Sequence, residues 1–313
     1  MTGPHTTGAP VGVMDVGGSH VTAALVDPAA PGDVIAEAGS PIDPHAPLDT
    51  LLDQLTAPAR SLAATTHVRG WSVAMPGPFD AAAGRGTFAG VEKFQSLAGV
   101  DLRAALAARL AVEPRAVRFT NDAVAYGIGE WAVGAGARAG RMVCITLGTG
   151  VGSAFLDDGH EVSSGETVPE AGEVHRLTID GRPLEDTVST RALRGEHHRR
   201  TGGRCSVEEI CMLARAGDVV SAEVVGTAMR ALGAALAPWV AGFGASRLVV
   251  GGSIARSWDV IGPPLRRGLG EPAPGGAAGA GPAGDVVVVP AVLGARAPLT
   301  GAAVEWGRGH PGA

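Results

Sequence analysis

The sequence predicts an α/β protein made of two similar halves. Two segments, residues 11–27 and 143–156, each follow the order strand, glycine turn, strand, and each opens about half of the chain. Such a recurrence indicates an internal structural duplication. A third segment, residues 116–131, places a buried strand directly before a helix, as α/β proteins do. At 313 residues the chain is long enough for two domains with separate cores.

Composition and charge favour a globular protein without a nucleic-acid partner. Hydrophobic residues make up 45% of the chain and charged residues 18%, which argues against a disordered protein. The formal net charge of −6 argues against an affinity built on nucleic-acid phosphates. We therefore expect the basic run at residues 197–200 to be a solvated loop.

The cysteines and the apolar segments predict a cytoplasmic protein. Cys144, Cys205 and Cys211 show no CxxC spacing, so we expect neither a disulfide framework nor a cysteine zinc site. The first ten residues lack a basic region followed by an apolar run, which argues against a signal peptide. Glycine, proline or charge interrupts every long apolar stretch, so we expect no membrane segment.

The first hairpin, residues 11–27, has features of a phosphate-binding turn. Gly17 and Gly18 allow the backbone to approach a ligand closely and to point N–H groups at it. Asp15 ends the first strand and could hold Mg²⁺ through water, since Mg²⁺ favours carboxylates together with retained waters. An ordinary hairpin with an aspartate near its turn is the alternative.

The second hairpin, residues 143–156, repeats the pattern around Gly148 and Gly150. It is not a Walker loop, because the GK[ST] ending is missing. It is not a Rossmann fingerprint either, because a strand follows the turn where that fold has a helix. Two such turns facing each other would offer two sets of backbone N–H groups to a polyphosphate.

The stretch at residues 119–130 carries an amide and a carboxylate where a strand meets a helix. At such a position an acid can accept the proton of a hydroxyl while the neighbouring amide holds the substrate. Asn121 and Asp122 are the two residues concerned. The alternative is an N-cap, since Asn and Asp satisfy the first N–H groups of a helix.

Further segments complete the expected architecture. Helices are predicted at residues 48–64, 101–110, 207–216, 221–243 and 298–306, and strands at 70–74, 247–250 and 285–290. A rigid turn at 75–79 precedes a loop at 84–99 that carries Lys93, the single lysine, and either lines a site or forms plain surface. The polar stretch at 170–186 could bind hydroxyls of a polyol or be a solvated loop. The glycine turn at 251–253 suits the wall of a nucleoside site, and residues 272–284 are expected to form a flexible loop.

Five motifs in this order resemble the ROK family (repressors, open reading frames, kinases) of the hexokinase/actin-like ATPase superfamily. They are a first phosphate motif at 15–19, a catalytic signature at 119–125 with Gly129-Glu130, a second phosphate motif at 147–152, an adenosine turn at 250–253 and a closing helix at 293–303. The resemblance extends from about residue 11 to residue 304.

The resemblance implies two RNase H-like, actin/hexokinase-like domains with a cleft that closes over Mg-ATP and a sugar. The N-terminal domain would span residues 1–120, with a C-terminal helix at 297–308 packing back on it, and the second domain would span 121–296. Asp122 would be the general base, and Asp15 would hold Mg²⁺ through water. The implied ATP-binding residues are Asp15, Gly17, Gly18, Ser19, His20, Gly148, Thr149, Gly150, Gly251, Gly252 and Ser253. The implied substrate-binding residues are Gly77, Pro78, Gln95, Ser96, Asn121, Asp122, Glu173, His175 and Glu185.

The departures from the family pattern all concern sugar recognition. The zinc motif of the family, a histidine followed by CxCGxxGC, is absent, so we predict no structural zinc. His175 stands one residue early relative to the usual GExGH, and Glu185 stands where the family has GCLE. Gln95 or Ser96 is the candidate replacement for the usual sugar-binding asparagine.

The resemblance implies an ATP-dependent hexokinase or glucokinase-type phosphotransferase in the cytoplasm. Its substrate would be a hexose phosphorylated on the 6-hydroxyl, either glucose or an amino sugar such as kanosamine, glucosamine or N-acetylmannosamine. One alternative is a catalytically silent sugar sensor or scaffold. Another is a transcriptional repressor, for which the roughly ten residues before residue 11 leave no room for a DNA-binding helix pair. A sugar is the expected partner, without nucleic acid or membrane, and a homodimer is a further expectation.

Overall fold

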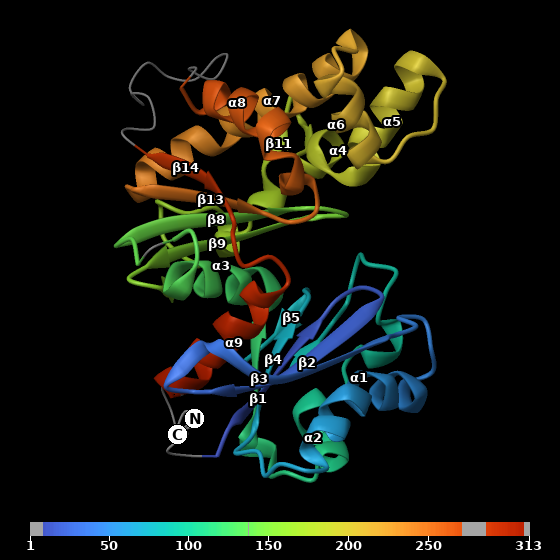
Figure 1. Ribbon diagram of the computed structural model, residues 1–313, viewed down its shortest axis with the longest axis vertical. Coiled ribbons are helices and arrows are strands. Elements are labelled where there is room, and N and C mark those ends of the chain that lie inside the picture. Colours follow the sequence, from blue (N-terminus) through green and yellow to red (C-terminus); the bar gives the residue numbers. More distant parts are fainter. Residues whose placement is uncertain (1–8, 137, 271–285, 310–313) are drawn as a thin grey trace, which may run out of the picture. The chain divides into compact units, whose positions relative to one another are not determined.

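The structure is a computed structural model that describes residues 9–136, 138–270 and 286–309 (Figure 1). The chain divides into two compact units, Met1–Gly129 with Ala295–Ala313 and Glu130–Gly294. Each unit holds its own five-stranded sheet, so the repeated hairpin does mark two α/β halves. The segment before residue 9 and the expected flexible loop at 272–284 lie outside the described residues.

The first unit is built on a mixed sheet. Its strand order is β3 (Ala30–Pro41), β2 (His20–Asp27), β1 (Val11–Val16), β4 (Trp71–Met75) and β7 (Val117–Asn121). β1 and β2 form the predicted antiparallel hairpin, and β3 continues it, whereas β1, β4 and β7 run parallel. A short ribbon of β5 (Phe79–Asp80) and β6 (Arg85–Gly86) follows β4.

Side-chain alternation along β1 gives this sheet two buried faces. Met14 and Val16 point into a core with α1 (Leu48–Ala63) and α2 (Leu102–Leu110). Val11 and Val13 point to the other face, where they pack with Leu299 of α9 (Arg296–Arg308). The C-terminal helix therefore covers the face of the first sheet that α1 and α2 leave open.

Helix α3 (Asp122–Val133) follows β7 directly and crosses α9 at close range. A Cβ on Gly301 would overlap the carbonyl of Ala125, and one on Gly129 would overlap the carbonyl of Ala297. Glycine at these positions lets the two helix backbones touch. The end of α3 is fixed by Glu130, whose buried carboxylate accepts backbone N–H groups from Ala135, Val292 and Leu293.

The second unit repeats the mixed sheet. Its order is β10 (His160–Glu161), β9 (Val151–Asp157), β8 (Arg141–Leu147), β13 (Arg247–Gly251) and β14 (Val287–Pro290). β8 and β9 form the second predicted hairpin, and β8, β13 and β14 run parallel. A ribbon of β11 (Thr178–Ile179) and β12 (Arg182–Pro183) leads to the helices. These are α4 (Glu185–Val188), α5 (Thr190–Thr201), α6 (Val207–Arg215), α7 (Val219–Phe243) and α8 (Trp258–Gly270).

Helix α7 is long and apolar enough to cross a membrane by length and composition alone. Its Leu232, Leu236 and Val240 lie in the core of the second unit. It also touches α8 at backbone distance, since a Cβ on Gly233 would overlap the carbonyl of Leu265. A single helix of this kind, packed in a core, is weak evidence for a membrane span.

The expectation of a loop at residues 197–200 was wrong, because these residues form the last turn of α5. Ser189 caps the helix by accepting the N–H of Ala192 at 3.2 Å, and Gly202 ends it in the left-handed region with φ 74°. Ser at the N-cap and Gly after the last turn are ordinary helix boundaries. His197 is buried and lies 3.2 Å from the hydroxyl of Ser221.

Candidate functional site

The parallel strands of the first unit bring the predicted catalytic residues to one sheet edge. Asp15 on β1 is in register with Ala74 on β4, which is in register with Thr120 on β7. The chain leaves each of these strands at its carboxyl end, where α/β sheets carry their sites. Asp15, the Gly77-Pro78 turn and Asn121-Asp122 therefore lie at three adjacent strand ends.

Asn121 is the N-cap of α3, so the capping alternative is realised at this residue. Its Oδ1 accepts the N–H groups of Ala123 at 3.0 Å and Val124 at 3.2 Å. These two hydrogen bonds fix the Oδ1 of Asn121, so its Nδ2 points toward Gly77. Nδ2 lies 3.9 Å from the position that a Cβ on that glycine would take. The Gly77-Pro78 peptide bond is cis.

Asp122 opens α3, and its environment favours the neutral acid. Burial raises the pKa of Asp122, while hydrogen bonds from the N–H of Ala123 and from its own N–H lower it in part. Burial also raises the pKa of Asp15 to about 7, with a further increase from the charge of Asp122. Neighbouring buried carboxylates with raised pKa values are typical of catalytic positions and of cation sites.

The first glycine turn offers unused backbone donors. Gly17 closes the turn by donating its N–H to the carbonyl of His20 at 2.9 Å. Among the described residues, the N–H groups of Gly18 and Ser19 have no acceptor. Two adjacent free N–H groups suit an anion.

Lys93 lies over this turn, although sequence reasoning gave it no role. Its Nζ occupies the place that a Cβ on Gly18 would take. Within the described chain, the ammonium group has neither an ion-pair partner nor a hydrogen bond. The only signal in the sequence was that this is the single lysine of the chain.

Gln95 and Ser96 use their side chains to hold their own loop. The Nε2 of Gln95 donates to the carbonyls of Phe88 and Val91 at 2.7 Å and 2.5 Å. The hydroxyl of Ser96 donates to the carbonyl of Ala46 at 2.9 Å. Their predicted contact with a sugar stays a prediction.

The second glycine turn is tied to the start of α5. Gly148 donates its N–H to the carbonyl of Gly150 at 3.0 Å, and its own carbonyl accepts both the N–H and the hydroxyl of Thr190. The N–H groups of Thr149 and Gly150 have no acceptor within the described residues. The second turn thus repeats the pair of free donors found in the first.

Glu185 belongs to this turn. Its Oε1 accepts the N–H of Val151 at 2.7 Å and lies 2.9 Å from the Cβ position of Gly150. The predicted sugar contact of this carboxylate stays a prediction, whereas its contact with the second turn is present in the structure.

The third glycine turn adjoins the second. Gly252 has φ +85°, and a Cβ there would overlap the backbone of Leu147. Ser253 Oγ lies 3.5 Å from the Cβ position of Gly148. Only glycine permits this approach, and the approach puts the third glycine turn beside the second.

Glu173 and His175 lie in a polar group of their own. Glu173 accepts a hydrogen bond from Nε of Arg176 at 2.6 Å and lies 3.7 Å from Nε2 of His175. Ser153 of β9 anchors this segment by donating to the carbonyl of Gly172 and accepting the N–H of Val174. Arg176 was not singled out from the sequence, and it is the charged partner of Glu173.

In the first unit, the free donors of the first turn and the carboxylate of Asp15 are groups of the kind that bind a phosphate and its Mg²⁺. No cluster of three or more His, Cys, Asp or Glu side chains that could hold a metal ion occurs in the described part of the chain. Mg²⁺ bound with a nucleotide needs only one or two carboxylates, because phosphates and waters supply the other ligands. Asp15 and Asp122 match that requirement.

A model of the ROK family matches residues 11–308, nearly the whole chain. The chain belongs to the ROK family. Among curated relatives, the polyphosphate glucokinase of Mycobacterium tuberculosis is 32% identical over 201 residues, which cover 60% of this chain and 69% of that protein. The polyphosphate glucokinase of Mycobacterium leprae is 28% identical over 181 residues, covering 56% and 50%. An uncharacterized protein of Clostridium perfringens is 34% identical over 73 residues, covering 23% of this chain and 24% of that protein. This ROK chain therefore spans from about a quarter to about two thirds of these relatives.

Solved structures share the fold of this ROK family member over almost its full length. A ROK hexokinase from Thermus thermophilus has a TM-score of 0.74 at 24% identity, covering 96% of this chain and 100% of that chain. A ROK family glucokinase from Streptomyces griseus, in complex with glucose and AMPPNP, has a TM-score of 0.73 at 24% identity, covering 94% and 98%. An inorganic polyphosphate/ATP-glucomannokinase from Arthrobacter sp. strain KM has a TM-score of 0.65 at 25% identity, covering 97% and 100%. The fold is the two-domain fold of actin and hexokinase.

Proposed function

We propose that this ROK family protein is an ATP-dependent sugar kinase that transfers the γ-phosphate of Mg-ATP to a hexose hydroxyl. The observation that carries the proposal is the pair Asp15 and Asp122 on one sheet edge, beside a glycine turn with free N–H groups and an unpaired ammonium group. The names of the relatives from Mycobacterium and Arthrobacter support a phosphotransferase that acts on sugars. The expected cytoplasmic setting, where ATP is abundant, belongs to the same proposal, and the homodimer stays a prediction.

Asp122 is the general base of the proposed reaction. Its raised pKa makes it a stronger proton acceptor than an ordinary aspartate, and its place at the start of α3 fixes its backbone. The Nδ2 group of Asn121 donates to a neighbouring hydroxyl, because the cap already uses the Oδ1 of that side chain. Together they orient one sugar hydroxyl and remove its proton.

The phosphate groups are held mainly by backbone donors. In the first unit, the free N–H groups of Gly18 and Ser19 neutralise phosphate oxygens, and Lys93 adds a full positive charge at that turn. In the second unit, the free N–H groups of Thr149 and Gly150 offer the same chemistry. Mg²⁺ held by Asp15 through water would supply charge neutralisation to the phosphates. Phosphoryl transfer needs chiefly positioning and charge, and these groups provide both.

The sugar is proposed to be glucose, or an amino sugar such as kanosamine, glucosamine or N-acetylmannosamine, phosphorylated on the 6-hydroxyl. The printed descriptions of the glucokinase and glucomannokinase neighbours support a hexose. Glu173 and His175 are the proposed hydroxyl partners in the second unit. The pairing of Glu173 with Arg176 leaves its second carboxylate oxygen for a substrate.

A second candidate is a catalytically silent sugar sensor. The observation that favours it is that Gln95, Ser96 and Glu173, three of the proposed sugar contacts, already bond within the protein. A sensor would bind sugar without phosphorylating it. The two candidates differ in turnover alone.

The test is ADP release from Mg-ATP in the presence of single sugars. The panel is glucose, glucosamine, mannose, N-acetylmannosamine, N-acetylglucosamine, fructose and kanosamine, each with a parallel thermal-shift measurement. A kinase releases ADP with at least one sugar and at a much lower rate without sugar. Thermal stabilisation by a sugar without ADP release from any of them would replace the kinase with the sensor.

A further inference from the structure

Lys93 is the only side-chain amine of this protein, because every other member of its Lys and Arg set is an arginine. Arginine keeps its proton at neutral pH, whereas the amine of lysine becomes a nucleophile when it loses a proton. The Lys93 side chain is exposed, and its ammonium group has neither an ion-pair partner nor a hydrogen bond within the described chain. An electrophile in solution can therefore reach this amine.

The backbone next to Lys93 is anchored in an unusual conformation. Phe94 has φ +63°, in the left-handed region that few residues other than glycine adopt. Its buried ring packs on that of Phe88 with the centroids 5.7 Å apart, and its N–H donates to the carbonyl of Pro44 at 2.9 Å. Such a conformation persists where the surroundings fix it, and it is found at functional positions. Lys93 thus extends from a fixed backbone, with its amine exposed.

The amine lies beside two free donors for an anion. Its Nζ occupies the place that a Cβ on Gly18 would take, and the N–H groups of Gly18 and Ser19 have no acceptor among the described residues. A phosphate group suits such a pair of N–H groups. In an acyl phosphate the carbonyl carbon is bonded to a phosphate oxygen, so binding of the phosphate group brings that carbon to the amine. Holding two reacting groups together raises the rate of their reaction.

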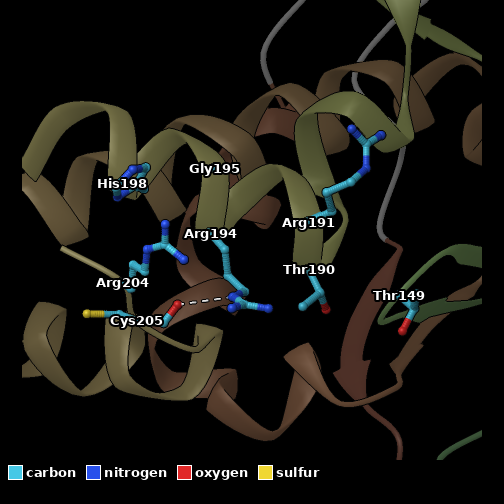
Figure 2. A pocket seen from close by; sticks show the side chains of 8 residues that line it. All are labelled: Thr149, Thr190, Arg191, Arg194, Gly195, His198, Arg204 and Cys205. Atoms are coloured by element: carbon cyan, nitrogen blue, oxygen red, sulfur yellow. Dashed lines mark hydrogen bonds between the residues drawn. The ribbon is translucent and has the colours of Figure 1, made fainter. Parts of the chain in front are cut away.

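A second group of cations does not offer this chemistry. The second unit has a hollow of about 440 Å³, and its lining includes Arg191, Arg194 and Arg204 (Figure 2). An acyl phosphate bound there would meet guanidinium groups, which keep their protons. Cys205 also lines the hollow, and an acyl group on its thiol would be a thioester. Hydroxylamine cleaves thioesters and leaves amides intact, so the products at Cys205 and Lys93 can be distinguished.

We propose that Lys93 is a modification site that accepts an acyl group from acyl phosphates, the mixed anhydrides of a carboxylic acid and phosphoric acid. The lone pair of the neutral Nζ forms a bond to the carbonyl carbon. The bond from that carbon to the bridging oxygen breaks, and its electron pair leaves with inorganic phosphate. A proton of the amine passes to water, and the product is a neutral amide.

Acylation removes the positive charge at the first turn. The phosphate groups of a nucleotide then lose the cation over Gly18, because an amide is neutral. The acylated protein therefore uses Mg-ATP less well than the unmodified protein. This consequence rests on the proposed kinase function, whereas the modification itself does not.

The test compares two acetyl donors on three proteins. Acetyl phosphate carries the phosphate group, and the N-hydroxysuccinimide ester of acetic acid does not. Wild type, Lys93→Arg and Gly18→Ala are treated with each donor and then with hydroxylamine. Peptide mass spectrometry measures the acetylation rate of residue 93 relative to that of the α-amino group of the same protein.

The two variants separate the amine from its position. Lys93→Arg keeps a positive charge and removes the nucleophile. Gly18→Ala keeps the backbone N–H groups, and its methyl group takes the place of Nζ. Gly18 lies outside the left-handed region, so alanine suits its backbone.

In wild type, the ratio of the two rates should be at least about tenfold higher with acetyl phosphate than with the ester, because only acetyl phosphate binds the turn first. Inorganic phosphate should remove most of this difference, since it competes for the same N–H groups, and Gly18→Ala should reduce it as well. Protein acetylated at Lys93 should lose about tenfold or more in kcat/KM for Mg-ATP. Lys93→Arg treated in the same way should keep its own untreated value.

Two results would overturn the inference. The first is an equal ratio of rates with both donors. The second is a ratio that inorganic phosphate leaves unchanged, which would separate the reaction from the first turn. Acetylated protein with an unaltered kcat/KM would overturn the effect on Mg-ATP. If no form of the protein phosphorylates any sugar, the kinase proposal fails, and the acetylation rates still decide whether Lys93 is the modification site.

Discussion

At the scale of single residues, the proposed site is built on two carboxylates, Asp15 and Asp122. Asp15 lies near the end of β1, and Asp122 opens α3 directly after β7. Burial raises the pKa of both carboxylates, and the charge of Asp122 raises the pKa of Asp15 further. Such an arrangement is unfavourable for stability alone. A bound cation would lower the free-energy cost of ionising these carboxylates, and a proton taken from a substrate would lower it as well. An arrangement that costs stability in this way therefore indicates function.

The first prediction concerns pH and stability. Asp15 has a pKa of about 7 in the folded protein against 3.8 for the ordinary group, so the folded state binds more protons than the unfolded state between these values. The contribution of Asp15 to stability therefore falls as pH rises from about 4 to about 7 and stays low above that range. Asp15→Asn removes the penalty and should raise the melting temperature at pH 8, in chelator, by a few degrees, on the order of 1–3 kcal/mol. A variant that melts below wild type at pH 8 would contradict the assignment.

The second prediction concerns Lys93. Lys93→Ala removes the ammonium group above Gly18 and should lower kcat/KM for Mg-ATP by about tenfold to a hundredfold. Lys93→Arg keeps the charge and should recover part of the loss. The measurement is steady-state kinetics at saturating sugar, and an unaltered kcat/KM in Lys93→Ala would remove the residue from the site.

The positions of these residues were only partly predictable from the sequence. The positions of Asp15 and Asp122 follow from strand ends, which the pattern of apolar residues predicts. Lys93 was not predictable, because a long loop with no periodicity brings it to Gly18. The contact of Glu185 with the second turn was missed for the same reason, since 34 residues separate it from Val151.

At the scale of elements, α3 and α9 form a joint that depends on glycine. Gly129 and Gly301 let the backbones meet, and α9 in turn covers the apolar face of β1. Because α3 begins with Asp122, the packing of the C-terminal helix helps to fix the proposed base. The segment that carries the motif at 293–303 therefore supports the site structurally.

The third prediction compares two glycines of the same helix. Gly301→Ala forces a methyl group into the carbonyl of Ala125 and should destabilise the protein by about 1–3 kcal/mol. Gly307→Ala is the control, because its nearest atom is the carbonyl oxygen of Pro28 at 4.0 Å. The control should be neutral or up to about 1 kcal/mol more stable, since alanine favours helix. Chemical denaturation measures both, and equal effects would contradict the close packing.

Elements with strong periodicity were predicted well, and polar ones were not. Both hairpins and α1, α2, α6, α7 and α9 agree with the sequence to within a few residues. Helix α5 was missed because its residues are mostly polar and its apolar face is narrow. Ser189 and Gly202 were the available signals, since they occupy the two cap positions.

At the scale of the whole molecule, two units of one architecture each supply a glycine turn with free donors. The family match over residues 11–308 agrees with the order of the five motifs. Neither the sequence motifs nor the fold determine the substrate, because one fold serves many reactions. In this ROK protein the sugar contacts proposed for the second unit lie in short, irregular segments that hold each other through Arg176 and Ser153.

The measurement that tests the central claim most directly compares Asp122→Asn with wild type on the best sugar of the panel. We measure kcat from ADP release and sugar affinity by calorimetry on the same preparations. The account predicts that kcat falls at least about a hundredfold, because asparagine cannot accept the proton, while sugar affinity changes less than about threefold. A variant that keeps near-normal kcat would show that Asp122 is not the base and would leave Asn121 and Asp122 as the cap of a helix.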